Sequence, residues 1–446
     1  MGRGASRKTL GYLCRFPTRR PPIRTFCIFL PLMVLVACTG SARRSSVVSS
    51  SAVAVPSTAG AAAANGTLEI GLLLPTSGPR AALGRPLANG ALMAVDEINE
   101  AGGLFGRPVT LVDRDEGSEP AAGSAALASL ADTNIDAIIG PASSRLALAT
   151  IPLINRLQRP TCSPAAHGLS VAEVTDGGFF FRTIPSEALE ARALAAVISS
   201  TGRRSTSILY SDDSHGLAWA STMAAELRRN GSSRVTTISY DPALSDNEQA
   251  VGRALGDGVP ESIAVIGSPE SASPILTTLR EKGAGPQQVP TFVNDALRVP
   301  DLHRFMTQAT PDFTERIEGV SPAVLPGPPS WQERYAARFP NSPAGYAAYA
   351  YDCVMLIALA AAGARTDAGF GIAERMTDTS RGGTQCRTID TCLALVNEGL
   401  NLDYEGASGS VDLTDSGDVM SGYFDQFRLD ATGYDEKIGS RWVTSG

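Results

Sequence analysis

The sequence predicts an α/β protein with two doubly wound parallel-sheet lobes. Short apolar runs alternate with amphipathic stretches of a dozen or more residues, as parallel strands do when helices cover both faces of their sheet. The alternation occurs in two successive series, one beginning near Leu68 and the other near Phe179. The 446 residues suffice for two or three domains of ordinary size.

The first series predicts the following elements, named by their residues. They are a strand at 68–75 (LEIGLLLP), a helix at 88–101, a strand at 108–115 (PVTLVDRD), a helix at 119–132, a strand at 135–140 (IDAIIG), a helix at 143–157 and a short strand at 160–164 (PTCSP). The second series predicts strands at 179–185, 205–212, 234–240, 261–267 and 289–295, with helices at 186–201, 216–230 and 270–282.

The remaining residues depart from this alternation. Helices are expected at 329–340 and 345–364, with a short one near 391–399. The stretch SGSVDLTDSGDVMSGYFDQFRLD (408–430) predicts a strand, an Asp/Gly-rich turn and a second strand. A terminal hairpin after helices indicates that the chain crosses between its lobes more than once.

Charge is unevenly distributed along the chain. The formal net charge is −7, and seven Lys/Arg residues without any acid lie in the first 24 positions. Without that segment 31 basic residues stand against 45 acidic ones, a net charge of −14. Such a surface argues against a nucleic-acid partner.

The start of the chain resembles an export signal. A basic stretch precedes the apolar run Phe26–Ala37, which is too short to span about 30 Å of hydrocarbon. We therefore expect a signal peptide over 1–37. LVAC resembles the bacterial lipobox, which predicts lipidation of Cys38, membrane anchoring and an extracytoplasmic location, and the alternative is a plain signal peptide with a chance cysteine. The Ser/Ala-rich remainder of 38–66 is typical of a flexible tether.

The other cysteines form two pairs of different character. Cys386 and Cys392 lie close together in the polar stretch QCRTIDTC, and export favours a disulfide between them. Cys162 and Cys353 lie in apolar contexts, and we expect buried thiols there. The histidines are His167, His215 and His303, and no Cys or His spacing resembles a metal site, so we expect no metal and no cofactor.

Two serines follow a predicted buried strand. After Gly140-Pro141, Ser143 and Ser144 begin a helical pattern. One interpretation is ordinary N-capping. The other is that the helix N–H groups and the hydroxyls hold an anion at the carboxyl end of the sheet, where ligands of doubly wound folds bind.

The motifs over 68–430 together resemble the leucine/isoleucine/valine-binding family, the extracytoplasmic substrate-binding proteins of branched-chain amino-acid-type ABC transporters. IGLLLPTSGP resembles the family's opening strand and Ser-Gly-Pro loop, and IIGPASSRLALATIPLINRLQRPTCSPAA its G-P-x-x-S segment with the following S-P-x-x pair. FFFRTIPS resembles the first crossover, ILYSDDSHGLAWA the strand–loop–helix of the second lobe, and YDCVMLIALA and GSVDLTDSGDV the later helix and closing hairpin.

This resemblance implies the periplasmic binding protein type I fold, with two lobes joined by a three-strand hinge. It implies an N-terminal lobe of 67–185 plus 322–409 and a C-terminal lobe of 186–321 plus 410–446. It further implies a monomer that captures a small amino-acid-like solute between the lobes and delivers it to an ABC permease.

The resemblance also implies a binding site. Ser144, with Ser143 beside it and the Ala165 backbone, would hold a carboxylate, and His167 stands where the family more often has Thr. On the opposite lobe His215 replaces the usual Tyr before Gly, and Asp295 is the acid expected to meet an ammonium group. An aromatic wall position falls on Leu83, and the loop after IAVIG offers Ser268, so the site lacks much of the family's aromatic lining. His167 and Asp295 as plain loop residues remain the alternative.

Two other functions compete with transport. The same fold serves as a ligand sensor that signals to a membrane partner. A serine hydrolase using Ser144, His167 and an acid is the enzymatic alternative, although GPASS lacks the second glycine of a G-x-S-x-G elbow. We therefore expect no catalytic residues.

Overall fold

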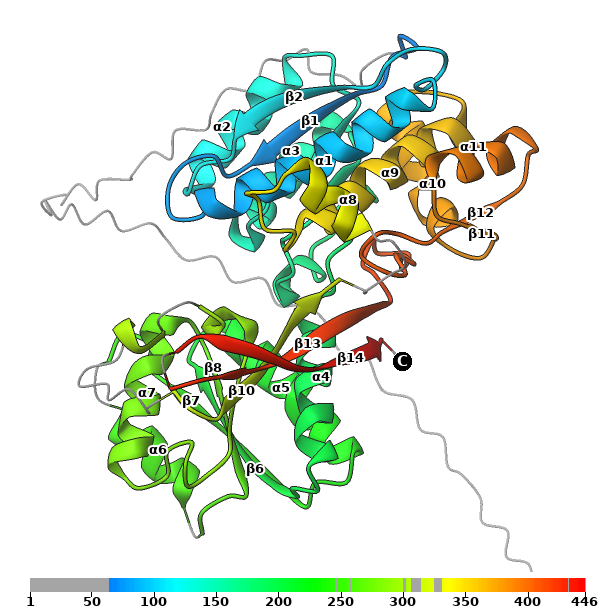
Figure 1. Ribbon diagram of the computed structural model, residues 1–446. Helices are drawn as coiled ribbons and strands as arrows, with labels where there is room; N and C mark the ends of the chain where they lie inside the picture. Colours follow the sequence, from blue (N-terminus) through cyan, green and yellow to red (C-terminus); the bar gives the residue numbers. More distant parts are fainter. Residues whose placement is uncertain are drawn as a thin grey trace, which may run out of the picture. The chain divides into compact units, whose positions relative to one another are not determined.

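A computed structural model describes residues 64–244, 247–256, 258–299, 302–305, 314–324, 331–431 and 433–445 (Figure 1). The predicted signal peptide and Cys38 lie outside these residues, as does most of the tether. Two large sheets organise the described part of the chain.

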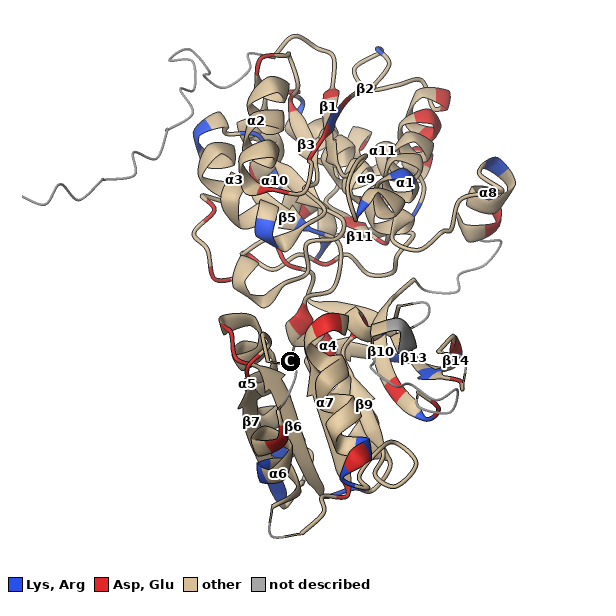
Figure 2. Cartoon of the chain, turned by 90° about the vertical axis from the view of Figure 1, so that its left-hand side faces the viewer, with Lys and Arg blue, Asp and Glu red and all other residues tan. Residues whose placement is uncertain are grey.

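The first sheet is entirely parallel and has the strand order β2-β1-β3-β4-β5. Its strands are β1 (Glu69–Leu74), β2 (Thr110–Asp115), β3 (Ala137–Ile139), β4 (Thr161–Ser163) and β5 (Phe180–Arg182). Helices α2 (Pro120–Ala131) and α3 (Ser144–Leu157) pack together on one side, and α1 (Ala81–Glu100) and α9 (Ala347–Ala364) on the other (Figures 1 and 2). Apolar strands covered on both faces thus form one buried core, as the alternation predicts.

The second sheet has the order β14-β13-β10-β9-β8-β6-β7. Its parallel strands are β6 (Ser205–Ser211), β7 (Arg234–Tyr240), β8 (Ser262–Ile266), β9 (Thr291–Val293) and β10 (Ile317–Ala323). Strands β13 (Ser421–Leu429) and β14 (Asp435–Thr444) are antiparallel, so this sheet is mixed at one edge. Its helices are α4 (Glu187–Ser200), α5 (Ser214–Arg229), α6 (Glu248–Leu255) and α7 (Pro269–Glu281), and short 3-10 turns η2 (Asp295–Leu297) and η3 (Leu302–Phe305) follow β9.

The order of the described elements takes the chain from one sheet to the other after β5, after β10 and after β12 (Leu402–Tyr404). Between the last two crossings lie α8 (Trp331–Arg338), α9, α10 (Gly369–Ser380), β11 (Thr384–Cys386) and α11 (Ile389–Asn397). Their buried side chains share one apolar cluster with the first sheet. These elements give two α/β lobes joined by three crossings of the chain, as the resemblance implies.

The long helix α9 is apolar enough to cross a membrane, but 89% of its most apolar stretch is buried within the fold. Tyr351 and Cys353, for example, lie in the core shared with the first sheet. Burial on all sides explains why this helix is apolar all round, and α9 is therefore a core helix.

The predicted hairpin over 408–430 is wrong in its position. Leu413 and Val419 form only an isolated bridge, whereas the hairpin consists of β13 and β14. The sequence of β14 is polar because this strand lies at the sheet edge and is largely exposed, so it lacks the apolar run used for prediction. Helices α6 and α10 were also not predicted, since one is short and polar and the other begins at a glycine-rich stretch.

The expectation of free thiols at Cys162 and Cys353 is wrong. Strand β4 and helix α9 bring their Cα atoms to 5.6 Å, within the usual range for a disulfide, and the two sulfurs are bonded. A sequence separation of 191 residues leaves no local signal for this pair. Cys386 and Cys392 form the second disulfide, which joins β11 to α11.

Candidate functional site

The start of α3 carries no side-chain cap. Ser143 occupies the N-cap position with extended backbone (φ −111°, ψ 130°), but its side chain makes no capping hydrogen bond. The carbonyl oxygen of Ser143 accepts the N–H of Ala147, as the first bond of the helix requires. The N–H groups of the first turn therefore point out of the helix without a partner from Ser143, which leaves them suited to an anion.

Ser144, the first residue of α3, contacts the loop that follows β4. Its hydroxyl oxygen accepts the N–H of Gly168 at 3.0 Å. A Cβ atom at position 168 would lie 2.8 Å from that oxygen and 2.9 Å from the Ser144 Cβ, so only glycine permits this approach. Because the hydroxyl acts as acceptor here, its proton remains available to a second group.

The loop before α3 is fixed by two charged side chains, Glu116 and Arg80, that no local sequence pattern marks out. Oε2 of the buried Glu116 accepts the N–H of Ala142 at 2.6 Å, and Arg80 donates to the Ala142 carbonyl at 2.7 Å. Burial raises the pKa of Glu116 to about 7, even though the Ala142 N–H and Arg80 act in the opposite direction. These contacts hold the GPASS loop at the end of β3.

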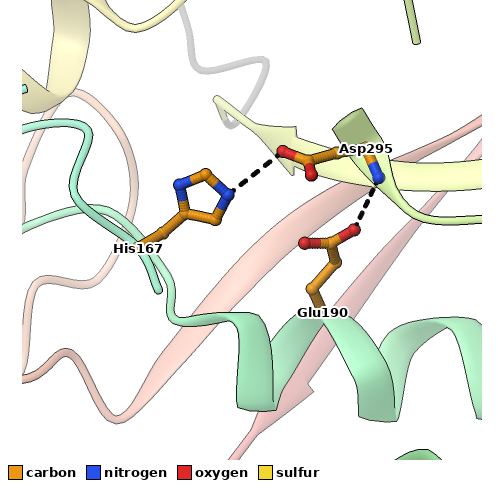
Figure 3. A group of neighbouring side chains, drawn as sticks. All are labelled: His167, Glu190 and Asp295. Atoms are coloured by element: carbon orange, nitrogen blue, oxygen red, sulfur yellow. Dashed lines mark hydrogen bonds and ion pairs between the residues drawn. The ribbon is translucent and has the colours of Figure 1, made fainter. Parts of the chain in front are cut away.

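His167 has partners on both sides of its ring. Nε2 lies 3.3 Å from Oδ2 of Asp295 (Figure 3). Nδ1 lies 3.0 Å from the carbonyl oxygen of Ala165, and Nε2 is also 3.9 Å from Oε1 of Glu187. The Ala165 carbonyl also accepts the His167 N–H at 3.1 Å. The structure therefore brings together His167 and Asp295, two of the residues named from the sequence, although 128 positions separate them.

The first turn of α4 supplies two acids to this group, as Figure 2 shows at the start of that helix. Glu187 Oε1 lies 2.7 Å from Nε2 of His215, and its Oε2 accepts the N–H of Leu169 at 3.0 Å. Glu190 Oε1 accepts the backbone N–H of Asp295 at 2.8 Å. The sequence analysis missed both acids because Glu in a first helical turn is common, and their three-residue spacing on one helix face was the available signal.

The charges of neighbouring side chains shift the pKa values of His167, His215 and Glu187. Burial by itself would lower the pKa of His167, but the carboxylates of Asp295, Glu187 and Glu190 outweigh it and raise the pKa to about 10. The hydrogen bond that the His215 N–H donates to Glu187 raises the pKa of His215. Burial opposes ionisation of Glu187, yet the two histidines lower its pKa to about 2. The acids therefore favour the protonated form of both imidazoles, and the histidines favour the ionised form of Glu187 between them.

Two other residues predicted to contact the solute have structural partners of their own. Ser268 caps α7, accepting the N–H of Ser271 at 3.3 Å in a capping box, and Leu83 of α1 packs on the core of the first lobe. Tyr346, which the sequence analysis did not choose, precedes α9 and lines a cavity of about 460 Å³ together with Asp295. Burial, followed by the charges of Asp295 and Glu190, raises the pKa of Tyr346.

Comparisons with known proteins agree with this fold. A family model described as periplasmic binding protein matches residues 67–383. The chemotactic signal transduction system substrate-binding protein BasB of Halobacterium salinarum is 28% identical over 376 residues, which cover 81% of this chain and 87% of that protein. Leu/Ile/Val-binding protein BraC3 of Rhizobium johnstonii is 29% identical over 198 residues, 44% of this chain and 53% of that protein.

Solved structures of substrate-binding proteins also match this fold. The branched-chain amino acid transporter substrate binding protein LivJ of Streptococcus pneumoniae, in complex with isoleucine, is 21% identical with a TM-score of 0.62, and the match covers 85% of this chain and 99% of that one. A substrate-binding protein from Desulfitobacterium hafniense, in complex with leucine, is 23% identical with a TM-score of 0.64, and the match covers 83% and 100% of the two chains. At these identities the likeness establishes the fold.

Proposed function

The chain belongs to the periplasmic binding protein family, in the group of the leucine/isoleucine/valine-binding proteins, and we propose that it captures a small carboxylate-bearing solute between its two lobes. It is a substrate-binding protein of this type. The solute class that we propose is an amino acid or a related small carboxylate or amide. Extracytoplasmic location is a property of the family.

The observation that carries this proposal is the uncapped start of α3. Ser143 leaves the first-turn N–H groups free of a side-chain cap, and the Ser144 hydroxyl retains a proton to donate. Helix N–H groups and the positive end of the helix dipole together favour a carboxylate. The solute's carboxylate would therefore sit on α3, with Ser144 as an added donor.

The opposite end of the solute would face the acids. Asp295 and Glu187 suit an ammonium group, but the His167 imidazolium lies 3.3 Å from Asp295. A solute ammonium would have to share or displace that cation. The cavity beside Asp295 and Tyr346 would accept the solute's side chain, and Tyr346 supplies an aromatic surface that the sequence-based site lacks.

We further propose that the protein is a monomer, anchored through lipidated Cys38, that delivers its solute to an ABC permease. Two acyl chains on one cysteine would give stable anchoring. A Cys38→Ala variant should therefore leave the membrane fraction for the soluble one. Unchanged partitioning would contradict the anchor and leave the binding function untouched.

Sensing is the second candidate, and the similarity to BasB, a chemotactic signal transduction protein, favours it. Copurification separates the two functions. Transport predicts that the protein binds a permease complex, whereas sensing predicts that it binds a transmembrane receptor. Both candidates need the same solute site.

Catalysis by Ser144 has no support in the contacts of His167. A hydrolase would need an imidazole nitrogen against the Ser144 hydroxyl. Instead the two ring nitrogens of His167 lie against Ala165 and Asp295, and the hydroxyl oxygen lies against Gly168. We therefore propose binding without catalysis.

A thermal-shift screen tests the proposed function. Amino acids, their amides and small organic acids are added at saturating concentration, because a bound ligand stabilises the folded state by RT ln(1 + [L]/Kd). At least one carboxylate should raise Tm by several degrees, and its amide should raise Tm less. If none of these compounds raised Tm, the result would contradict the proposed solute class.

A further inference from the structure

The ring of His167 and two acids converge from three separate segments. His167 lies in the loop after β4, Glu190 on α4, and Asp295 in the turn after β9 (Figure 3). One potential ligand atom from each lies within 4.8 Å of the other two. An imidazole nitrogen with two carboxylate oxygens is a ligand set for a divalent transition metal.

The orientation of the His167 ring suits coordination. Because Nδ1 lies 3.0 Å from the Ala165 carbonyl oxygen, it donates its hydrogen there, and a metal ion would displace only the Nε2 proton that faces the acids. Metal-bound histidines commonly have such a partner, which fixes their ring. Nε2 lies 3.3 Å from Asp295 Oδ2, close to the distance of about 3.3 Å between two ligand atoms of a tetrahedral zinc ion with bonds of about 2.0 Å.

Glu190 gives an independent indication of a missing partner. Its side chain is fully buried, and Oε1 accepts the Asp295 N–H. Oε2 is also buried, and no donor among the described residues reaches it. A buried carboxylate oxygen without a partner is costly, and a bound cation would remove that cost.

We propose that Nε2 of His167, Oε2 of Glu190 and an oxygen of Asp295 bind a divalent transition-metal ion of the Zn²⁺ type. Glu187, which is hydrogen-bonded to His215 and lies 3.9 Å from Nε2 of His167, would not bind the metal itself but would help to orient the His167 ring. Three protein ligands leave one tetrahedral position open for water or for an oxygen of a solute. The inference goes beyond the proposed function, because metal binding needs no solute.

Competition with a chromogenic zinc chelator tests this site in the full chain without added solute. The wild type should remove one equivalent of Zn²⁺ that His167→Gln, Asp295→Asn and Glu190→Gln each bind at least tenfold more weakly. Asp415→Asn is the matched control, since that surface carboxylate is 93% exposed and paired with Arg381, and it should bind zinc as the wild type does. Cysteines outside the described residues are common to all variants, so they cancel in the comparison.

Cobalt(II) gives a second measurement. Its visible d–d absorption should appear in the wild type and be absent in Glu190→Gln, which keeps the side-chain shape and the acceptor for the Asp295 N–H and so guards against loss of folding. Equal zinc affinity in the wild type and all three variants, or a wild type without the specific equivalent, would overturn the inference. A solute-induced Tm shift that persists in that case would leave the proposed function standing.

Discussion

The hydroxyl oxygen of Ser144 accepts the backbone N–H of Gly168 at 3.0 Å, which ties the start of α3 to the loop after β4. This bond sets the distance between the helix N–H groups and the imidazole of His167, one residue before the glycine. The proposed carboxylate site at the start of α3 and the cluster of His167 with its acids are therefore linked through the backbone of residues 167–168. Changes at either residue should affect both.

Gly168→Ala should weaken solute binding. The added Cβ would lie 2.8 Å from the Ser144 hydroxyl oxygen, so the loop must move away from α3. We expect at least a tenfold rise in the Kd of the solute found by screening, measured by titration calorimetry. Gly252→Ala is the control, because a Cβ there has no neighbour within 4 Å, and it should bind normally. Equal Kd values for both variants would contradict the proposed geometry.

Ser144→Ala removes one donor to the proposed carboxylate while the helix N–H groups remain. A hydrogen bond to a charged group contributes about 1.5–3 kcal/mol, so we expect affinity to fall by one to two orders of magnitude for the carboxylate. Binding of the corresponding amide should change much less. A loss of the same size for both compounds would indicate that Ser144 acts only through the loop.

Glu116 should make stability depend on pH in a specific direction. Burial raises the pKa of Glu116 to about 7 from its usual 4.5, so the folded chain keeps a proton that the unfolded chain releases. The retained proton stabilises the folded state relative to the ionised form. This contribution of Glu116 to the free energy of unfolding is fully present below pH 4.5 and is lost as pH rises through 7. Glu116→Gln should therefore gain about 2–3 kcal/mol relative to the wild type between pH 5 and 8.

Urea unfolding of the wild type and of Glu116→Gln at pH 5 and at pH 8 measures this gain in the free energy of unfolding. Glu119→Gln, a change at a largely exposed carboxylate, is the control and should show no such gain. A difference between wild type and Glu116→Gln that stays constant across the range would show that the buried carboxyl does not titrate there.

The two disulfides should contribute unequally. Closing a loop of 191 residues corresponds to about 5 kcal/mol in the chain-entropy account, against about 2 kcal/mol for the short loop at Cys386–Cys392. The double variant Cys162→Ala/Cys353→Ala should therefore unfold at a clearly lower temperature than Cys386→Ala/Cys392→Ala. Calorimetry without reductant compares them, and equal losses would contradict the cross-linking role of the buried pair.

The sequence predicts those parts of the fold and site that depend on local pattern. Strand ends could be placed because apolar runs stop there, and this made Ser143 and Ser144 candidates. The family resemblance added His167, His215 and Asp295 as candidates. Strand β14 was missed because an exposed edge strand carries no apolar run.

Other parts of the site depend on contacts between distant residues. Glu187 and Glu190 read as ordinary first-turn acids until α4 is placed beside His167 and Asp295. Glu116 is distinguished only by its burial against Ala142. The expectation of no metal site considered spacing along the chain, whereas His167, Glu190 and Asp295 come together only through the fold.

A crystal structure of the protein with the best solute from the screen tests the central claim most directly. The account predicts electron density for the solute's carboxylate within about 2.7–3.2 Å of the Ser144 hydroxyl oxygen and of first-turn N–H groups of α3. A carboxylate bound elsewhere, or the start of α3 filled by another part of the protein, would contradict it.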